Sequence, residues 1–287
     1  MSRSVSETVR LKDGTVLPRL GQGTWQMGEQ PSKRAEELAA LRRGVELGMN
    51  LIDTAEMYGD GRSEELVGEA LRGIRDEVFL VSKVYPHNAG NGKLVSSCEA
   101  SLKRLGTDHL DLYLLHWRGS VPLQETVEGM EALVASGKIL RWGVSNLDTA
   151  DMQELLSIPG GDHCAVNQVL YHLGSRGIEH ELLPWLRGHQ IPVMAYSPLA
   201  QAGALRKGLA DNEAVQQIAR SHGVTPLQVL LAWSIREADV LAIPKAGSPA
   251  HVEENAAARS LVLSEDELWQ LEDAFPQPSW KVPLDMI

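Results

Sequence analysis

The sequence predicts a single α/β domain over residues 1–287, a (β/α)8 or TIM barrel with an N-terminal β-hairpin that plugs it. Three observations support this fold. Short β-branched apolar runs recur along the chain, amphipathic helices with clear ends lie between them, and most runs are apolar throughout instead of alternating. Continuously apolar strands are typical of a parallel sheet that is covered on both faces. Eight such units favour a closed barrel over an open doubly wound sheet.

Most of the predicted strands begin roughly 25 to 32 residues apart, which is the length of a strand, a loop, a helix and a return loop. A hairpin is expected before them over residues 9–18, because Asp13-Gly14 is a turn sequence, and it could close the floor of the barrel. The eight strands are predicted over residues 20–24 (the weakest), 51–55, 78–84, 110–116, 141–146, 165–169, 192–196 and 240–245.

The helices are predicted from their ends as well as from their apolar faces. Ser32 is expected to cap the first helix, which runs to residue 47 and stops at Gly48. The long segment over residues 200–240 is expected to hold an additional loop and two helices. Further helices are predicted over residues 122–136, from the Thr225-Pro226 start, and from the capping box that begins at Ser264.

Composition excludes several classes of function. The chain has 27 Lys and Arg against 38 Asp and Glu, a net charge of −11, which argues against nucleic-acid and anionic-membrane partners. No run approaches the roughly 18 apolar residues of a membrane span, and the N-terminus shows no apolar signal core. Cys98 and Cys164 have neither disulfide nor metal-site spacing. We therefore expect a cytoplasmic monomer that acts on a small molecule and holds no metal.

Polar and titratable side chains are concentrated where the predicted strands end. In a barrel of this kind the chemistry lies at the C-terminal ends of the strands. A purely structural barrel has no need of such side chains there, so the sequence predicts a functional site at this face. The residues concerned are Asp53, Lys83, His116, Ser145, Asn146, Gln168, Tyr196 and Lys245.

Several of these residues lie in motifs that resemble, in order, those of the aldo-keto reductase superfamily. The motifs are Leu51-Ile-Asp-Thr-Ala-Glu-Met-Tyr-Gly59, Val81-Ser-Lys83, Leu114-Leu-His116, Gly143-Val-Ser-Asn146 and Ile243-Pro-Lys245. The stretch from Asn167 to Gly177 is similar to small bacterial members that reduce methylglyoxal and related aldehydes. The resemblance implies a barrel that binds NADP(H) without a Rossmann fold, and NADPH-dependent reduction of aldehydes and ketones to alcohols by pro-R hydride transfer.

Carbonyl reduction needs an acid as well as a hydride donor, and Tyr58 is the candidate acid. Lowering a tyrosine pKa from about 10 to near 7 takes roughly 4 kcal/mol, which an ammonium such as that of Lys83 about 4 Å away supplies at an effective dielectric of 20. Asp53 would orient Lys83, and a neutral His116 would hydrogen-bond the substrate oxygen. The resemblance gives the same four residues the roles of a catalytic tetrad. Each alone could be structural; their joint occurrence in matching motifs favours catalysis.

The resemblance also assigns the cofactor contacts. Ser145, Asn146 and Gln168 would hold the nicotinamide carboxamide, for which amide side chains offer both donors and acceptors. Tyr196 would stack on the nicotinamide ring. The other expected contacts are Ser197, Leu199, Gln201 and Gly203 in a loop over the pyrophosphate, Lys245, Ala246 and His251 at the 2′-phosphate, and Glu254 and Asn255 at the adenine.

The 2′-phosphate region departs from the family pattern. Ser or Thr usually follows the lysine, and an Arg comes several residues later, whereas this chain has Ala246 and His251. Histidine lacks the planar, permanently charged fork of arginine. We therefore expect NADPH to be preferred over NADH, but with less discrimination than is usual, and NADH to remain usable.

The substrate pocket is expected to be walled by Trp25, Tyr85 and Trp117, which follow the first, third and fourth strands. The tail beyond Phe275 is short, so we expect a fairly open mouth that suits small or variable carbonyl compounds. Two alternatives remain at this point. One is a dehydrogenase of sugar or steroid alcohols, and the other is a regulatory nicotinamide-binding subunit of the same fold.

Overall fold

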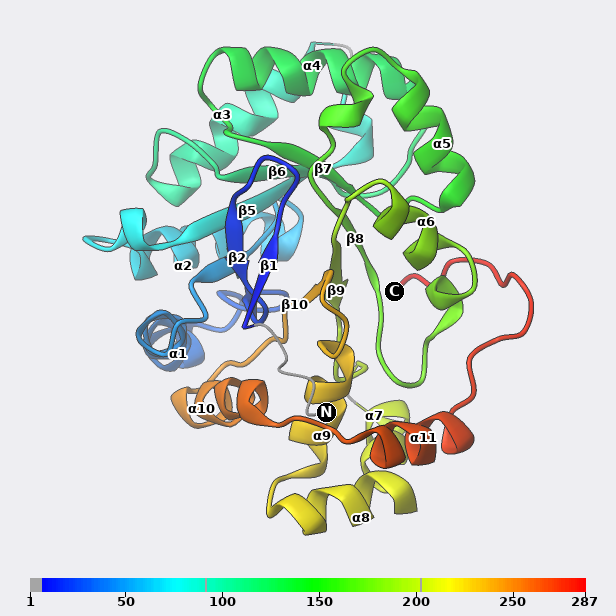
Figure 1. The fold of residues 1–287 in the computed structure, drawn as a ribbon. Helices are drawn as coiled ribbons and strands as arrows, with labels where there is room; N and C mark the ends of the chain where they lie inside the picture. Colours follow the sequence, from blue (N-terminus) through cyan, green and yellow to red (C-terminus); the bar gives the residue numbers. More distant parts are fainter. Residues whose placement is uncertain (1–6, 91, 202) are drawn as a thin grey trace.

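The computed structural model describes residues 7–90, 92–201 and 203–287. Eight parallel strands follow one another in chain order through one sheet, as Figure 1 shows. The predicted barrel is confirmed, with strands that are shorter than the apolar runs. The strands are β3 (Gln22–Gly23), β4 (Leu51–Asp53), β5 (Phe79–Val84), β6 (Leu112–Leu115), β7 (Trp142–Ser145), β8 (Asn167–Leu170), β9 (Val193–Tyr196) and β10 (Val240–Ala242).

The first and last strands close the barrel. Bridges join Leu20 to Ala242 and Gly23 to Lys245, both in parallel orientation. The backbone approaches so closely here that a Cβ on Gly23 would lie 2.7 Å from the carbonyl oxygen of Ile243. Glycine is therefore required at this seam, which explains why the first strand gives the weakest apolar signal.

The predicted N-terminal hairpin is present as β1 (Thr8–Arg10) and β2 (Val16–Pro18), paired antiparallel. Its side chains Val9, Leu11 and Leu17 are buried in one cluster with inward-facing side chains of the barrel strands, among them Leu112 and Leu241. The hairpin thus closes the lower end of the barrel interior, and the open end is the one where the strands terminate.

The helices form an outer layer around the sheet (Figure 1). Their inner faces bury a second, larger cluster of aliphatic and aromatic side chains against the outer face of the strands. The helices are α1 (Arg34–Glu46), α2 (Arg62–Ala70), α3 (Lys93–Leu105), α4 (Leu123–Ala135), α5 (Thr149–Ser157), α6 (Leu182–Gly188), α7 (Ala204–Ala210), α8 (Glu213–His222), α9 (Pro226–Ser234), α10 (Pro249–Ala257) and α11 (Glu265–Ala274).

Two helix predictions are confirmed in detail and two are wrong. The capping boxes at Thr225 and Ser264 begin α9 and α11. Ser32 does not cap α1: it lies inside a single 3-10 turn that Pro31 opens, and α1 continues from that turn without a side-chain cap. The segment after β9 holds three helices, not two, because the Asn212 side chain caps α8 and separates it from α7.

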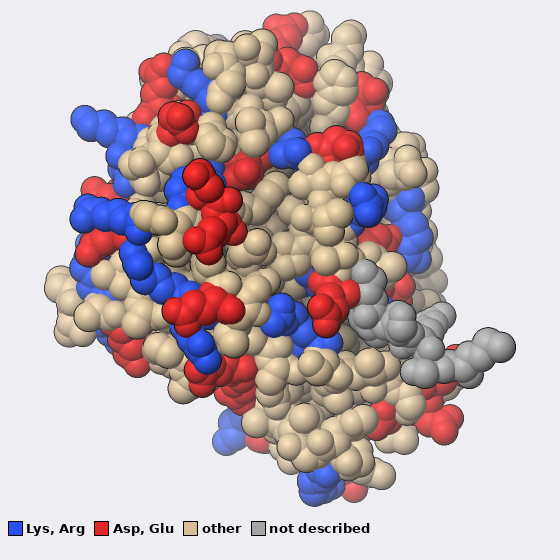
Figure 2. All heavy atoms as spheres, turned by 60° about the vertical axis from the view of Figure 1, so that its left-hand side comes forward, with Lys and Arg blue, Asp and Glu red and all other residues tan. Residues whose placement is uncertain are grey.

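Acidic and basic side chains are interspersed on the face that carries α1 and α2, as Figure 2 shows. Arg43 on α1, for example, pairs with Glu46 on the same helix and with Glu253 on α10. Within the described residues, no helix is both long and apolar enough to span a bilayer.

Candidate active site

A cavity of about 790 Å³ opens at the C-terminal ends of the strands. It brings together residues that are more than two hundred positions apart in the sequence, and most of the predicted site residues line it. These are Trp25, Asp53, Tyr58, His116, Trp117, Ser145, Asn146, Gln168, Tyr196, Ser197, Leu199, Gln201, Lys245, Ala246 and His251.

Lys83, at the end of β5, lies directly behind the cavity wall and connects the other polar groups. Its ammonium donates to the Tyr58 hydroxyl at 3.0 Å, to Asp53 Oδ1 at 2.6 Å and to the carbonyl oxygen of Thr54 at 2.9 Å. The Lys83 side chain is completely buried, so water does not compete for these bonds. Asp53 Oδ2 in turn accepts from Gln168 Nε2 at 2.8 Å. Tyr58 is therefore held in a fixed position with its hydroxyl at the cavity.

The expected depression of the Tyr58 pKa is wrong for the protein without ligand. Burial raises the pKa of Tyr58 above its ordinary value, and the charge of Lys83 only partly opposes this because Asp53 acts in the opposite sense. Burial also disfavours the charged form of Lys83, but the neighbouring Asp53 and Tyr58 outweigh it and raise the pKa of the amine. Tyr58 is consequently a protonated phenol next to a cationic amine near neutral pH, which is the form that can give up a proton.

His116 is poised as a neutral hydrogen-bonding group. Burial, assisted by the charge of Lys83, lowers its pKa to about 2. Its ring stands edge-on to Tyr58 with a centroid separation of 5.8 Å and lies against Trp117 at 4.8 Å. In the part of the chain that the structure describes, Nδ1 is buried without a partner and the imidazole makes no other hydrogen bond. His116 therefore has unused hydrogen-bonding capacity at the wall of the cavity.

A chain of hydrogen bonds joins the residues that were expected to hold the carboxamide. Ser145 Oγ donates to the carbonyl oxygen of Gln168 at 2.8 Å and accepts from Asn146 Nδ2 at 3.2 Å. The Tyr196 hydroxyl donates to Asn146 Oδ1 at 2.9 Å. These hydrogen bonds fix the orientation of the Asn146 amide and connect the ends of β7, β8 and β9.

Backbone strain is concentrated around the cavity. Gln26, Asn146, Ser197 and Ala200 all have positive φ angles, of 61°, 58°, 48° and 57°, and all four line the cavity. A side chain in this region costs roughly 1–3 kcal/mol, and such residues cluster at binding sites. Two of the four, Ser197 and Ala200, lie in the loop after β9. The strain in this loop indicates that its conformation serves ligand binding.

Basic side chains from three elements line the cavity. Lys245 follows β10, His251 lies on α10 and Arg206 lies on α7. Asp53, already bonded to Lys83, contributes the one acidic side chain among the lining residues. Arg206 was missed by sequence reasoning because it lies beyond the loop that the resemblance covers. Ala246 lines the cavity but offers no side-chain hydrogen bond.

Four of the expected contacts do not line the cavity. The Tyr85 ring stands edge-on behind Trp117 with a centroid separation of 5.9 Å, so it supports the wall instead of forming it. Gly203, Glu254 and Asn255 also lie outside the lining. Asn255 is buried, and the backbone oxygen of Glu254 accepts from Gln228.

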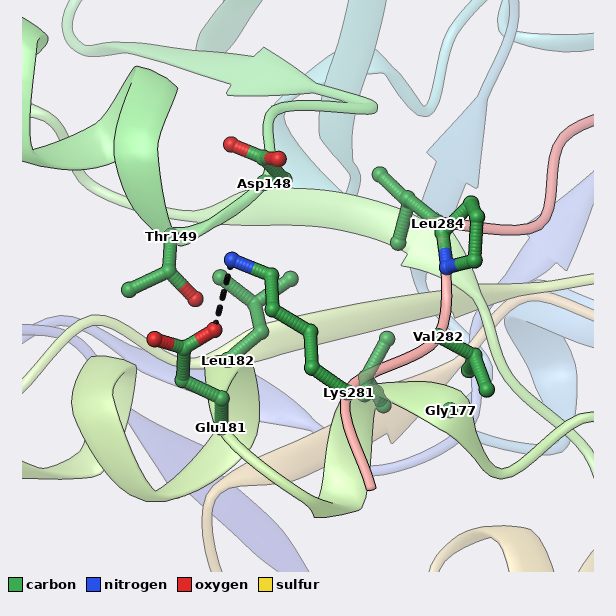
Figure 3. Close-up of a pocket in the computed structure, with 10 residues that line it drawn as sticks. Asp148, Thr149, Gly177, Glu181, Leu182, Lys281, Val282 and Leu284 are labelled. Atoms are coloured by element: carbon green, nitrogen blue, oxygen red, sulfur yellow. Dashed lines mark ion pairs between the residues drawn. The ribbon is translucent and has the colours of Figure 1, made fainter. Parts of the chain in front are cut away.

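The tail returns to the barrel, where Met286 and Ile287 line the cavity and remain exposed, so the tail forms part of the mouth. Figure 3 shows how the tail is attached beside α5 and α6, with Lys281 ion-paired to Glu181 at 2.7 Å. Ser175 Oγ also donates to Asp285 at 2.5 Å. Sequence reasoning missed this course because the tail has no periodic pattern and its partners lie about a hundred residues away.

Comparison with known proteins agrees with this geometry. The sequence pattern of the aldo/keto reductase family matches residues 19–275. The chain belongs to the aldo/keto reductase family. It is 63% identical to "Methylglyoxal reductase YeaE" of Escherichia coli over 279 residues, which cover 97% of this chain and 98% of that protein.

Other members of the aldo/keto reductase family are also similar. "Glyoxal reductase" of Bacillus subtilis is 34% identical over 93% of this chain and 92% of its own length. A crystal structure of an aldo/keto reductase from Klebsiella pneumoniae in complex with NADP and acetate superposes with a TM-score of 0.96. It has 59% sequence identity, and the match covers 99% of this chain and all of that one.

Proposed function

We propose that this aldo/keto reductase reduces small aldehydes and α-dicarbonyl compounds such as methylglyoxal to alcohols, with NADPH as hydride donor and Tyr58 as the acid. The observation that carries the proposal is the position of the Tyr58 hydroxyl. It faces the cavity, accepts a hydrogen bond from Lys83 at 3.0 Å and adjoins His116, whose Nδ1 has no hydrogen-bond partner within the described residues.

The charge of the cavity fits a phosphorylated dinucleotide. A phosphomonoester carries about −1.5 to −2 near neutral pH, and Lys245 and Arg206 place permanent positive charge in the cavity wall of a protein whose net charge is −11. Lys245 would pair with the 2′-phosphate, and the loop with Ser197, Leu199 and Gln201 would cover the pyrophosphate. Bound NADPH supplies a hydride. The Klebsiella pneumoniae relative was solved with NADP, which supports the same cofactor here.

The nicotinamide end would lie near the tetrad. The amide of Asn146, held by Ser145 and Tyr196, and the carbonyl oxygen of Gln168's side chain would bond the carboxamide. Gln168 already uses its Nε2 on Asp53, so its contribution to the carboxamide is as an acceptor. The Tyr196 ring would form the stacking surface.

The proton path follows from the hydrogen bonds. Tyr58 would donate its proton to the carbonyl oxygen of the substrate, on which negative charge develops. The ammonium of Lys83, already bonded to the phenolic oxygen, would stabilise the phenolate that remains. His116 is neutral and would donate a hydrogen bond to the same substrate oxygen, orienting it toward Tyr58.

Trp25, Met57 and Trp117 line the cavity beside Tyr58 and would form an apolar wall for a compact substrate. Two relatives are named as methylglyoxal and glyoxal reductases, which supports a small dicarbonyl as substrate. The test is the loss of NADPH absorbance with methylglyoxal, measured for the wild-type protein and for Tyr58→Phe. Tight NADPH binding without turnover of any aldehyde would instead favour a regulatory role.

A further inference from the structure

We infer that Arg206 is a further cofactor-binding residue that contacts the pyrophosphate of the dinucleotide, whereas Lys245 contacts the 2′-phosphate. The inference rests on the proposed function, in which Lys245 pairs with the 2′-phosphate. Neither the motifs of the chain nor the loop over residues 197–203 includes Arg206.

The packing of α7 turns Arg206 toward the cavity. Leu209, three residues further on, is buried in the main core and therefore marks the inner face of the helix, because residues three apart share a face. Leu205 and Lys207, on either side of Arg206, are exposed, and Leu205 presents 54% of its surface. Arg206 itself is half-buried and lines the cavity.

Arg206 has the free hydrogen-bonding capacity that this role requires. Across residues 7–90, 92–201 and 203–287, its guanidinium makes neither an ion pair nor a hydrogen bond, although most other half-buried arginines do so. Arg75, Arg104 and Arg118, for example, are each paired with a carboxylate. An arginine beside a cavity with its five donors unused is arranged for an anion from outside the protein.

The position of Arg206 in the chain selects the pyrophosphate over the 2′-phosphate. Lys245 and His251 approach from β10 and α10, whereas Arg206 follows the strained loop after β9. Since β9 and β10 are adjacent in the sheet, Arg206 and Lys245 reach the same cavity from neighbouring segments. The loop that includes Ser197 and Ala200 would cover the pyrophosphate, and Arg206 is the first cation after it.

This arrangement compensates for the missing arginine near the 2′-phosphate. His251 lacks the planar five-donor fork of a guanidinium, so Lys245 is the permanent cation on that side. A second full charge on the pyrophosphate raises the affinity for NADPH and NADH alike. It would therefore sustain cofactor binding and leave the ratio of the two affinities unchanged.

The test compares equilibrium binding of three ligands to Arg206→Gln, with Lys207→Gln on the exposed side of α7 as the matched control. For Arg206→Gln we expect the Kd of NADPH and of NADH to rise by the same factor, about tenfold or more. The Kd of 2′-AMP, which has the 2′-phosphate and lacks the pyrophosphate, should not change. Lys207→Gln should bind all three ligands as the wild type does.

Two results would overturn the inference. Weaker binding of NADPH and 2′-AMP with unchanged NADH would move Arg206 to the 2′-phosphate. Unchanged binding of both dinucleotides would remove it from the cofactor site. Lys245→Gln tests the proposed function separately: selective loss of NADPH and 2′-AMP binding is expected there whatever Arg206 does.

Discussion

The ammonium nitrogen of Lys83 lies 3.0 Å from the hydroxyl oxygen of Tyr58, and the lysine side chain has no exposed surface. Every hydrogen bond that this ammonium makes is to a neighbour fixed at a strand end or in the loop after it. The phenol is thus placed by the barrel itself, with its hydroxyl at the cavity, where the proposed function has it donate a proton to the carbonyl oxygen of the substrate.

Tyr58→Phe removes that proton and leaves the cavity shape nearly unchanged. We expect kcat/KM for methylglyoxal to fall by about 10²–10⁴-fold, the usual contribution of a general acid, while the Kd of NADPH stays at the wild-type value. Steady-state turnover and fluorescence titration measure the two quantities. Wild-type turnover in this variant would show that another group is the acid.

Lys83→Met leaves the Asp53 carboxylate buried without its cation. Loss of one member of a buried pair costs about 3–5 kcal/mol, so the free energy of unfolding in urea should fall by about this amount. The double variant Asp53→Asn, Lys83→Met should recover most of the stability and none of the activity. Equal stability of the single and double variants would mean that the pair is not coupled.

The lowered pKa of His116 predicts that the free energy of unfolding depends on pH. Its pKa is about 2 in the folded protein and about 6.5 when unfolded, so acid favours the unfolded chain. The full stability contribution is present above pH 6.5 and is lost by about 1.4 kcal/mol per pH unit below it.

His116→Gln removes this dependence. Between pH 7 and pH 5 the wild type should lose about 2 kcal/mol more unfolding free energy than the variant. The lowered pKa of His172, about 4, affects both proteins equally and cancels in the comparison. Parallel pH profiles for the two proteins would contradict a neutral His116.

His251→Arg should restore the guanidinium fork at the 2′-phosphate. We expect the ratio of kcat/KM with NADPH to that with NADH to rise by about tenfold, equivalent to roughly 1.4 kcal/mol. The matched control is His222→Arg, on α8 and bonded to Glu267. A wild-type enzyme that already prefers NADH would contradict the assignment of Lys245.

The parts of this molecule that follow local rules could be predicted from the sequence. The apolar runs placed the eight strands, and their last residues, such as Asp53 and His116, lie at the cavity as expected. The capping boxes at Thr225 and Ser264 are also local, because each involves residues three positions apart.

The features that the sequence did not predict depend on contacts between residues that are distant in the chain. Tyr85 was expected at the cavity, but Trp117, from the following strand, stands in front of it. The Tyr58 pKa depends on complete burial and on the balance between Lys83 and Asp53, which no motif specifies. Arg206 and Met286 reach the cavity from segments without a distinguishing pattern.

The N-terminal hairpin has a consequence for the kinetics. Val9, Leu11 and Leu17 seal the lower end of the barrel, so ligands reach Tyr58 from the side on which the strands end. A dinucleotide and a carbonyl compound would both enter through this one opening. The ligand that lies deeper in the cavity must therefore bind first and dissociate last. Product inhibition patterns for this enzyme should accordingly follow a compulsory order of binding and release.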